Sequence, residues 1–580
     1  MLRRTWNLLR AQRLSIALAV VLVVAQAAGT VAVPAAIRYG IDAGVRRRDL
    51  GALDLAALAA LVGALVSYAA GWGAVRVVAR VGERFLREMR ERVFAHQIGL
   101  SLDHFDRHRT GAVVSRLTAD IEVLQELVAQ SLTTFVVSAL LMLGVAGAMV
   151  VMSWELAFAV GLVAPLVLWV TVWFRRESNK VYVTVREHIA STLAVVAEGL
   201  AGIKVIQAFR RERAFLARFD ESNEEQYGAY MKGERLAAVF FPTIEAGQGI
   251  AIAAVLGLGG VLAARDAITV GTVAAFVLYA QNLFEPVQAL SQVVNTLQSS
   301  RAALHQLFAV LDEAPTVGEL DGAVALPSRG DLVVSGVSFR YGGPGLLGGA
   351  AAYVLEDVSI VVEAGERLAL VGPTGAGKST LAKLMARLYD PMAGSVSYGG
   401  TDLRDTTGAS LRERIVVVPQ EGFLFSGTIA DNLRLGRPSA SDSELNQAID
   451  RLGLGSRFAA LAGGSGLGAP IRERGANLSA GERQLVSLVR AALADPAVLV
   501  LDEATSSLDP GTERLVEQAM EQLMEGRTVV VVAHRLSTSE RADRVAVVDG
   551  GRIVEHGSHD DLITRGGAYS RLFQSWSTHP

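Results

Sequence analysis

The chain has 580 residues, of which 51% are hydrophobic and only 19% are charged, and its mean hydropathy is +0.35. A composition this apolar is unusual for a soluble protein but is expected for a chain of which about half lies in a membrane. The net charge of −3 gives no sign of a nucleic-acid-binding surface. The absence of cysteine excludes disulfides, thiolate metal sites and cysteine catalysis.

The N-terminus begins with arginines and continues into a long apolar stretch at 14–37 that has no small-residue cleavage site. This stretch can cross the ~30 Å hydrocarbon core, so we expect a retained helix and not a cleaved signal. In total, six apolar stretches predict six membrane-spanning helices: 14–37, 51–75, 127–152, 156–174, 238–264 and 268–292.

Two polar stretches with helical spacing, 76–126 and 175–237, separate pairs of these spans. They are too long for ordinary loops, so we expect the spans to continue as long helices outside the bilayer. The arginines between 76 and 92 favour a cytosolic location for the first of them. Against that orientation, Arg46, Arg47 and Arg48 fall on the expected outer side.

Polar side chains also occur inside the predicted spans. Uncompensated groups of this kind are costly in lipid, so they should face a bundle interior or a wet cavity. They are either part of a substrate pathway or partners in interhelical hydrogen bonds, and the second explanation is favoured only for Glu285. The set is Gln26, Glu245, Gln248, Gln281, Asn282 and Glu285.

After a predicted linker at 301–330, residues 372–379 match G-x-x-x-x-G-K-[ST] between a buried strand and a helix. Glycines let backbone amides close around a phosphate. Lys378 is expected to neutralise the β- and γ-phosphates, and Ser379 to hold Mg²⁺. The nucleotide-binding residues expected in this loop are Gly372, Thr374, Gly375, Gly377, Lys378, Ser379 and Thr380.

Two further apolar strands end in residues that suit phosphate chemistry. The strand 498–501 ends at Asp502 and Glu503, where the first carboxylate can bind the Mg²⁺ shell and the second can polarise an attacking water. The strand 528–533 is followed by His534, which can contact a γ-phosphate. Because this site needs cytosolic ATP, we keep the orientation despite the arginines at 46–48.

From residue 331 to near the C-terminus, these motifs resemble the ATPase domain of ABC transporters. The resemblance implies that Glu503 is the catalytic glutamate and His534 the switch histidine. It also implies that Gln420 links the γ-phosphate and Mg²⁺ to the membrane domain. Further residues expected to contact the nucleotide are Tyr341, which stacks on adenine, Ser479 and Gly481, which serve the opposite subunit, and Asp509 of the D-loop.

This sequence departs from the family pattern at two places. Residues 478–482 form the signature, in which Ala480 and Glu482 replace the usual Gly and Gln; we expect a working site. The Gly- and Ala-rich stretch 342–353 predicts a flexible surface insertion after Tyr341.

The first half resembles the membrane domain of type IV ABC exporters, with coupling helices expected near 103–110 and 208–215. The expected fold is thus an all-α, six-helix transmembrane domain with long cytosolic helix extensions, followed by an α/β P-loop ABC ATPase domain. We expect domains at 1–300 and 331–580 joined by the linker 301–330, in a multi-pass inner- or plasma-membrane protein whose ATPase domain is cytoplasmic. The chain ends soon after Trp576, which predicts a half-transporter.

The resemblance implies that two half-transporters pair around ATP and Mg²⁺, as a homodimer or a heterodimer. The expected partners are a second half-transporter subunit, the lipid bilayer and an amphipathic substrate, with no nucleic acid. The favoured function is ATP-driven export of a lipid, drug or peptide. An importer on the same fold, for example of a siderophore, is an alternative. An ATP-gated channel or a sensor subunit is an alternative from another class of function.

Overall fold

The computed structural model describes residues 10–108, 110–342, 353–420, 422–461, 464–502, 510–533 and 536–578. The chain divides into two compact units. The helical unit comprises Met1–Gln97 and Gly111–Asp312, and the α/β unit comprises Ile98–Thr110 and Glu313–Pro580. Loop 98–110 therefore belongs with the C-terminal part of the chain, although both of its neighbours in sequence lie in the helical unit.

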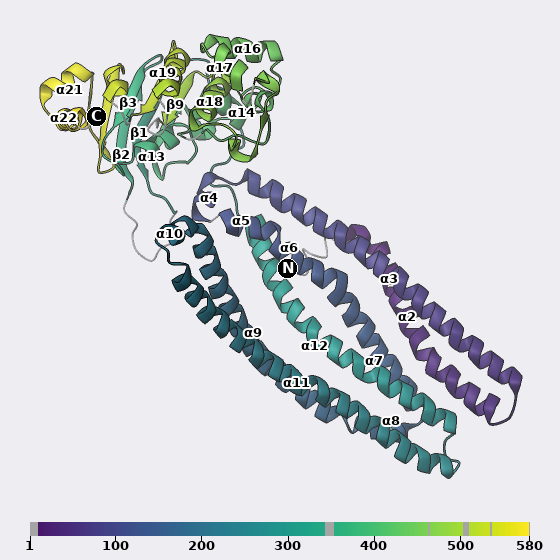
Figure 1. Cartoon of the computed structure of the whole chain (residues 1–580). Coiled ribbons are helices and arrows are strands. Elements are labelled where there is room, and N and C mark those ends of the chain that lie inside the picture. The colour runs from purple at the N-terminus through teal and green to yellow at the C-terminus, as the bar shows by residue number, and fades with distance from the viewer. Residues whose placement is uncertain are drawn as a thin grey trace. The chain divides into compact units, whose positions relative to one another are not determined.

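The helical unit consists of long helices joined by short turns (Figure 1). Its main helices are α2 (Arg13–Tyr39), α3 (Leu50–Gly99), α5 (Thr110–Leu117), α6 (Ala119–Glu126), α7 (Leu132–Met152), α8 (Trp154–Gly161), α9 (Ala164–Ala201), α10 (Ile203–Ala208), α11 (Glu212–Ala264) and α12 (Val270–Asp312). Because a helix rises 1.5 Å per residue, α3 is about 75 Å long, more than twice the thickness of a bilayer core. The predicted helical extensions are thereby confirmed.

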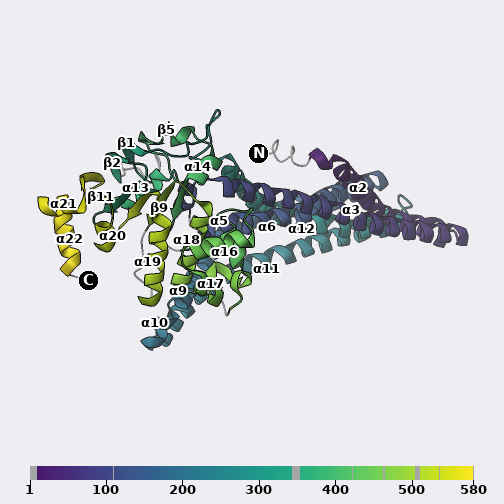
Figure 2. The ribbon, with the colours of Figure 1, turned by 90° about the horizontal axis from the view of Figure 1, so that it is seen from above.

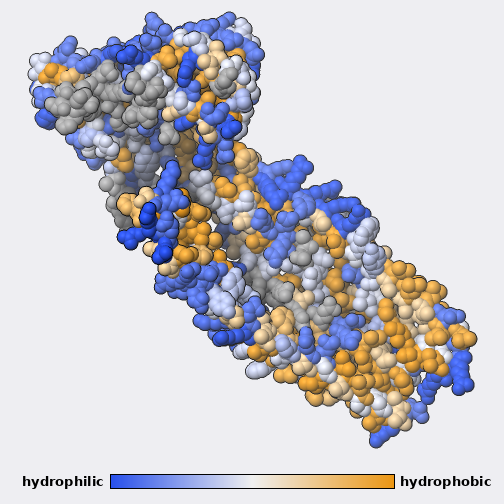
Figure 3. Space-filling model, viewed as in Figure 1, coloured by the Kyte–Doolittle hydropathy of each residue, from blue (hydrophilic) through white to orange (hydrophobic). Residues whose placement is uncertain are grey.

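Five helical segments of the described chain are long and apolar enough to cross a membrane: Arg13–Val45, Leu50–Gly99, Thr133–Met152, Trp154–Ala201 and Glu212–Ala264. The sixth predicted span, 268–292, corresponds to a shorter apolar segment, Val270–Phe284, at the start of α12. Helix α12 continues through the rest of the predicted span to Asp312, and the sixth span stays a prediction. On the face seen in Figure 3, hydrophobic residues predominate at one end of the helical unit, whereas hydrophilic and hydrophobic residues are mixed over the rest.

Buried side chains hold both parts of this unit together. Phe240, Phe276 and Tyr279 lie in a core formed by α7, α8, α9, α11 and α12. A second cluster joins Met89 of α3 and Leu124 of α6 to the later part of α12. At the opposite end, the guanidinium of Arg46 lies 3.3 Å from the carboxylate of Asp266, so this outer arginine is paired within the chain.

The α/β unit contains two larger sheets. The four-stranded sheet has the order β2-β1-β4-β5, formed by β2 (Leu355–Val362), β1 (Leu332–Phe339), β4 (Ala393–Tyr398) and β5 (Thr401–Asp402). The six-stranded sheet has the order β12-β11-β3-β10-β9-β6, formed by β12 (Arg552–Gly557), β11 (Arg544–Asp549), β3 (Arg367–Val371), β10 (Thr528–Val532), β9 (Val498–Asp502) and β6 (Ile415–Val418). A third, two-stranded sheet pairs β7 (Gly427–Thr428) with β8 (Pro470–Ile471).

In the six-stranded sheet, the five strands from β11 to β6 are parallel, and their side chains alternate between two cores. Val498 and Val500 of β9 pack in the same core as α13, whereas Leu499 and Leu501 pack in the core of α18. This alternation follows from the two-residue period of a strand that is covered on both faces. The apolar runs that predicted β3, β9 and β10 therefore correspond to buried central strands.

Helices cover the sheets and extend to both ends of the unit. They are α13 (Lys378–Met385), α14 (Gly408–Arg414), α15 (Ile429–Leu433), α16 (Asp442–Arg451), α17 (Gly455–Ala460), α18 (Ala480–Ala494), α19 (Pro510–Met524), α20 (Leu536–Glu540), α21 (His559–Arg565) and α22 (Ala568–Thr578). Helices α16 and α17 lie at one end of the α/β unit, and α21 and α22 at the other (Figure 1, Figure 2). A further short helix, α4 (Leu102–Arg107), lies in loop 98–110 and belongs to the same unit.

Candidate active site

The predicted phosphate loop connects β3 to α13, and its three glycines adopt positive φ angles. A methyl group on Gly372 would lie 2.0 Å from the carbonyl oxygen of Val548, and one on Gly377 would lie 2.7 Å from Leu355. Gly375 has open space around it, but its φ of +84° still disfavours other residues. The loop conformation thus requires glycine for two reasons, crowding and backbone geometry.

Lys378 is the first residue of α13, and its side chain folds back over the loop. Its Nζ donates to the carbonyl oxygens of Gly372 at 2.8 Å and Pro373 at 2.9 Å. Burial lowers the pKa of Lys378, and the nearby carboxylate of Asp502 partly opposes this effect. The loop thus holds a buried amine at the N-terminus of a helix, where backbone amides and the helix dipole favour a bound phosphate.

An aromatic side chain lies beside the first turn of α13. The hydroxyl of Tyr341, just beyond β1, is 3.1 Å from Oγ1 of Thr380. The ring of Tyr341 remains 37% exposed and contacts Tyr389 edge-to-face, with centroids 5.6 Å apart. The predicted adenine-stacking residue is thereby placed next to the phosphate loop. Of the predicted insertion 342–353, residues 343–352 lie outside the described part of the chain.

The predicted metal and catalytic residues follow adjacent parallel strands. Asp502 is the last residue of β9 and is half-buried, and Gln420 is exposed two residues after β6. Because β3, β10, β9 and β6 are adjacent and parallel, their carboxyl ends meet at one edge, where open α/β sheets bind ligands. Glu503, Asp509 and His534 lie outside the described residues.

The signature residues form the start of α18. Ser479 is its N-cap and makes a capping box with Glu482, whose backbone N–H donates to Ser479 Oγ at 3.2 Å. Glu482 also accepts a hydrogen bond at 2.8 Å from Arg457 of α17. Gly481 is buried, whereas Ser479 is exposed. Among the described residues, the hydrogen bonds of Ser479 stay within its own helix, and none joins it to the phosphate loop.

Sequence reasoning missed Tyr389, which follows the end of α13. Its hydroxyl donates a hydrogen bond to Asp106 of α4, and its ring packs against Tyr341 and Phe339. Burial and the bond to Asp106 raise the pKa of Tyr389. An aromatic residue just beyond a phosphate-loop helix is the only sequence signal for this contact, because Asp106 lies 283 residues away in the chain.

Comparisons with known proteins agree with this architecture. The family model described as "ABC transporter transmembrane region" matches residues 16–287, and the model described as "ABC transporter" matches residues 355–506. An ATP-dependent lipid A-core flippase of Desulfotalea psychrophila is 34% identical over 86% of this chain and 85% of its own length. This chain belongs to the ABC transporters.

Two further similarities narrow the type of transporter. A multidrug efflux ATP-binding/permease protein of Mycobacterium bovis is 34% identical over 99% of this chain, which spans 47% of that protein's length. The structure of a bacterial Atm1-family ABC exporter with ATP bound covers 97% of this chain and 98% of its own, with a TM-score of 0.80 and 28% identity. The chain is thus an exporter-type, multi-pass membrane protein whose cytoplasmic ATPase domain binds ATP and couples its hydrolysis to transport.

Proposed function

We propose that this chain is a half-transporter that exports an amphipathic compound, such as a lipid, drug or peptide, as part of a dimer. The observation that carries this proposal is the similarity of 97% of this chain to an ATP-bound exporter. The chain also carries a phosphate loop before α13 and a signature at the start of α18, which are the two halves of such a site. The flippase and efflux names of its relatives favour export over import. The proposed transmembrane domain has six spans, with α12 supplying the sixth, and the proposed boundaries are 1–300, 301–330 and 331–580.

The proposed chemistry assigns separate roles around the edge of the parallel sheet. Lys378 neutralises the β- and γ-phosphates, and Tyr341 stacks on the adenine. Glu503 positions the attacking water, and His534 contacts the γ-phosphate. Gly372, Thr374, Gly375, Gly377 and Thr380 complete the phosphate loop.

Mg²⁺ fits the donors present, because the hydroxyl of Ser379, the carboxylate of Asp502 and the amide oxygen of Gln420 are hard oxygen ligands. Among the described residues no group of three or more His, Cys, Asp or Glu side chains gathers into a metal cage. A magnesium ion at this edge would therefore draw its remaining ligands from phosphate and water, and it would supply charge neutralisation for the transferred phosphoryl group.

The dimer is proposed because one chain supplies only half of each composite site. Ser479 and Gly481, with Asp509, are proposed to complete the site of the partner subunit. Exposed apolar side chains lie on and directly after α10, in the helical unit: Val205 is 61% exposed, and Phe209, which follows the helix, is 73% exposed. A second half-transporter is the proposed partner of these residues, either a copy of this chain or a related one.

The cargo is proposed to pass along a face of α11 and α12 that carries polar residues. Glu245 is exposed, although its neighbours Ile244 and Gly247 are buried against other helices. Within the described part of the chain Glu245 has no hydrogen bond or ion pair, which supports the pathway explanation over an interhelical bond. Gln281 of α12 is exposed as well, whereas nothing is described of the side chain of Glu285.

The test is ATP-dependent transport by the purified chain in proteoliposomes, with a fluorescent phospholipid and a cationic dye as separate cargo probes. We expect uphill movement of one probe that is lost in Glu503→Gln. Glu503-dependent ATPase activity without movement of either probe would contradict an amphipathic cargo. Probe movement that only dissipates a gradient would indicate a channel, and folded protein with no ATPase activity would contradict a competent homodimer.

A further inference from the structure

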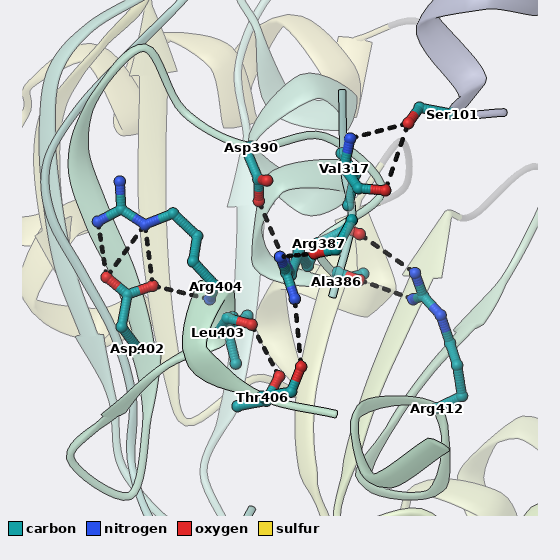
Figure 4. A network of polar contacts seen from close by, with 11 residues as sticks. Ser101, Val317, Ala386, Arg387, Asp390, Asp402, Leu403, Arg404, Thr406 and Arg412 are labelled. Carbon is teal, nitrogen blue, oxygen red and sulfur yellow. Dashed lines mark hydrogen bonds and ion pairs between the residues drawn. The ribbon is translucent and has the colours of Figure 1, made fainter. Parts of the chain in front are cut away.

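Loop 98–110 and the segment that follows α12 are joined by several polar contacts within the α/β unit. The backbone N–H of Val317 donates to Ser101 Oγ at 2.8 Å (Figure 4). Nδ1 of His104, which is only 2% exposed, lies 2.9 Å from a carboxylate oxygen of Glu313. The other carboxylate oxygen of Glu313 accepts a hydrogen bond from Arg107 at 3.1 Å.

These contacts favour the ionised form of Glu313. Burial acts to raise its pKa, but the hydrogen bond from His104 and the charges of His104, Arg107 and His108 outweigh it, so the pKa lies below its ordinary value. Charge-assisted hydrogen bonds are about twice as strong as neutral ones. Loop 98–110 and residues 313–318 are thus joined by an ionic contact at Glu313 and by a neutral hydrogen bond at Val317.

The same segment is held on its other side by Arg387, directly beyond the C-terminal end of α13. Arg387 is 4% exposed, and its guanidinium donates to the carbonyl oxygen of Gly318 at 2.7 Å and to Asp390 at 3.1 Å. Arg412 donates to the carbonyl oxygens of Ala386 at 2.8 Å and Arg387 at 3.1 Å, which fixes the backbone at the same helix end (Figure 4). A buried arginine with satisfied donors, such as Arg387, is costly to disturb.

We call the set Ser101, His104, Arg107, Glu313, Val317, Gly318 and Arg387 the loop–linker network. All three places where the chain passes between the two units, 97/98, 110/111 and 312/313, border this network. Helix α13 has only 8 residues and is therefore about 12 Å long, so a phosphate loop at one end lies close to Arg387 at the other. A shift of α13 would reach residues 313–318 through Arg387, and it would reach loop 98–110 both through these residues and through the hydrogen bond from Tyr389 to Asp106.

We propose that Arg387 is a positioning residue for coupling: it makes the end of α13, residues 313–318 and loop 98–110 move as one body when ATP binds. This inference rests on the proposed function, because it needs nucleotide binding at the phosphate loop. Lys378 would exchange the carbonyl oxygens of Gly372 and Pro373 for a phosphate of bound ATP, and this exchange would shift the N-terminal end of α13. Arg387 carries that displacement to both chain segments that lead to the helical unit.

Hydrogen–deuterium exchange of the full chain in nanodiscs tests this role, with Glu503→Gln as the background so that ATP is retained. We expect ATP to slow exchange at 372–380 and to change it at 98–110. In Arg387→Gln the response at 372–380 should remain, and the response at 98–110 should fall to the part that the Tyr389–Asp106 hydrogen bond transmits. An unchanged response at 98–110 would overturn the proposal, whereas no response at 372–380 in the background protein would instead refute the proposed nucleotide site.

The matched control is Arg404→Gln, which removes an arginine of the same unit whose guanidinium bonds to Asp402 outside the network (Figure 4). It should keep both responses. A second variant keeps Arg387 and therefore does not depend on whether the protein folds without it. It combines Ser101→Cys with Val317→Cys, so that oxidation can join loop 98–110 to the linker by a disulfide in a chain with no other cysteine. The oxidised pair should retain full ATPase activity, since loop and linker move together; inhibition relieved by a reductant would overturn the single-body model.

Discussion

The phosphate loop and the signature each lie at the N-terminus of a helix, but they are built differently. At α13 three glycines with positive φ angles shape the loop, and Lys378 is buried against the loop carbonyls. At α18 the cap is an exposed serine in a capping box, supported by the Glu482–Arg457 ion pair. The first is shaped to enclose a ligand, whereas the second is a rigid surface that can be offered to another molecule. Substitutions in the two regions should therefore impair different steps: ATP binding at the phosphate loop and closure of the dimer at the signature helix.

The largest effect is expected from Glu503→Gln, next to Asp502 at the end of β9. Loss of a general base typically costs about 100- to 10,000-fold in rate. ATPase turnover should fall within that range, while ATP binding persists and the closed dimer accumulates. A steady-state ATPase assay together with nucleotide binding measures both, and near-normal turnover would show that Glu503 is not the base.

Lys378→Ala should instead weaken binding at the phosphate loop. A hydrogen bond to a charged group contributes about 1.5–3 kcal/mol, which corresponds to an affinity loss of about 10- to 100-fold. The substitution also leaves the carbonyl oxygens of Gly372 and Pro373 without their donor. Titration with a fluorescent ATP analogue measures the change, and an unaltered affinity would remove Lys378 from the site.

Ser479→Arg should spare binding to the free subunit and block closure, because the added side chain lies on the exposed face of the cap. Crosslinking between subunits in the presence of ATP should fall together with turnover. Ser441→Arg is the matched control, since Ser441 caps α16 through the same kind of capping box with Glu444. Each substitution removes an N-cap side chain that contributes about 1 kcal/mol to stability. Equal losses of turnover in both variants would mean that only helix stability is affected.

The same comparison explains which parts of the structure the sequence could predict. The strands and the phosphate loop follow from local patterns: apolar runs with a two-residue period and glycines at fixed spacing. The long helices also follow from periodicity, but the short helix expected near 208–215 lies at Ile203–Ala208, because Arg210 has a φ of +51° and ends it. The sixth span at 268–292 stays a prediction, because the described residues match it only over Val270–Phe284.

Long-range polar contacts lie beyond such patterns. Arg387 reaches Gly318 across 69 residues, and Tyr389 reaches Asp106 across 283. Apart from the aromatic character of Tyr389, nothing local distinguishes either residue from an ordinary residue at the end of a helix. The same holds for Glu482, whose departure from the usual glutamine is visible in the sequence, while its partner Arg457 appears only when α17 and α18 are packed together.

The smallest effect is expected from Glu482→Gln, which restores the common signature residue. Glutamine can still complete the capping box with Ser479, so the cap geometry and turnover should be nearly unchanged. Only the ion pair with Arg457 is lost, and because its side chains are 36% and 17% exposed, a coupling energy of up to about 1 kcal/mol is expected. A double-mutant cycle with Arg457→Gln, read by thermal unfolding, isolates that term. The corresponding pair at α16, Arg437 and Glu444, is more exposed at 45% and 42%, so its cycle should give a smaller coupling energy.

A large gain in turnover from Glu482→Gln would instead mean that the glutamate limits the reaction. The departure from the usual signature would then be a regulatory feature and not a structural exchange.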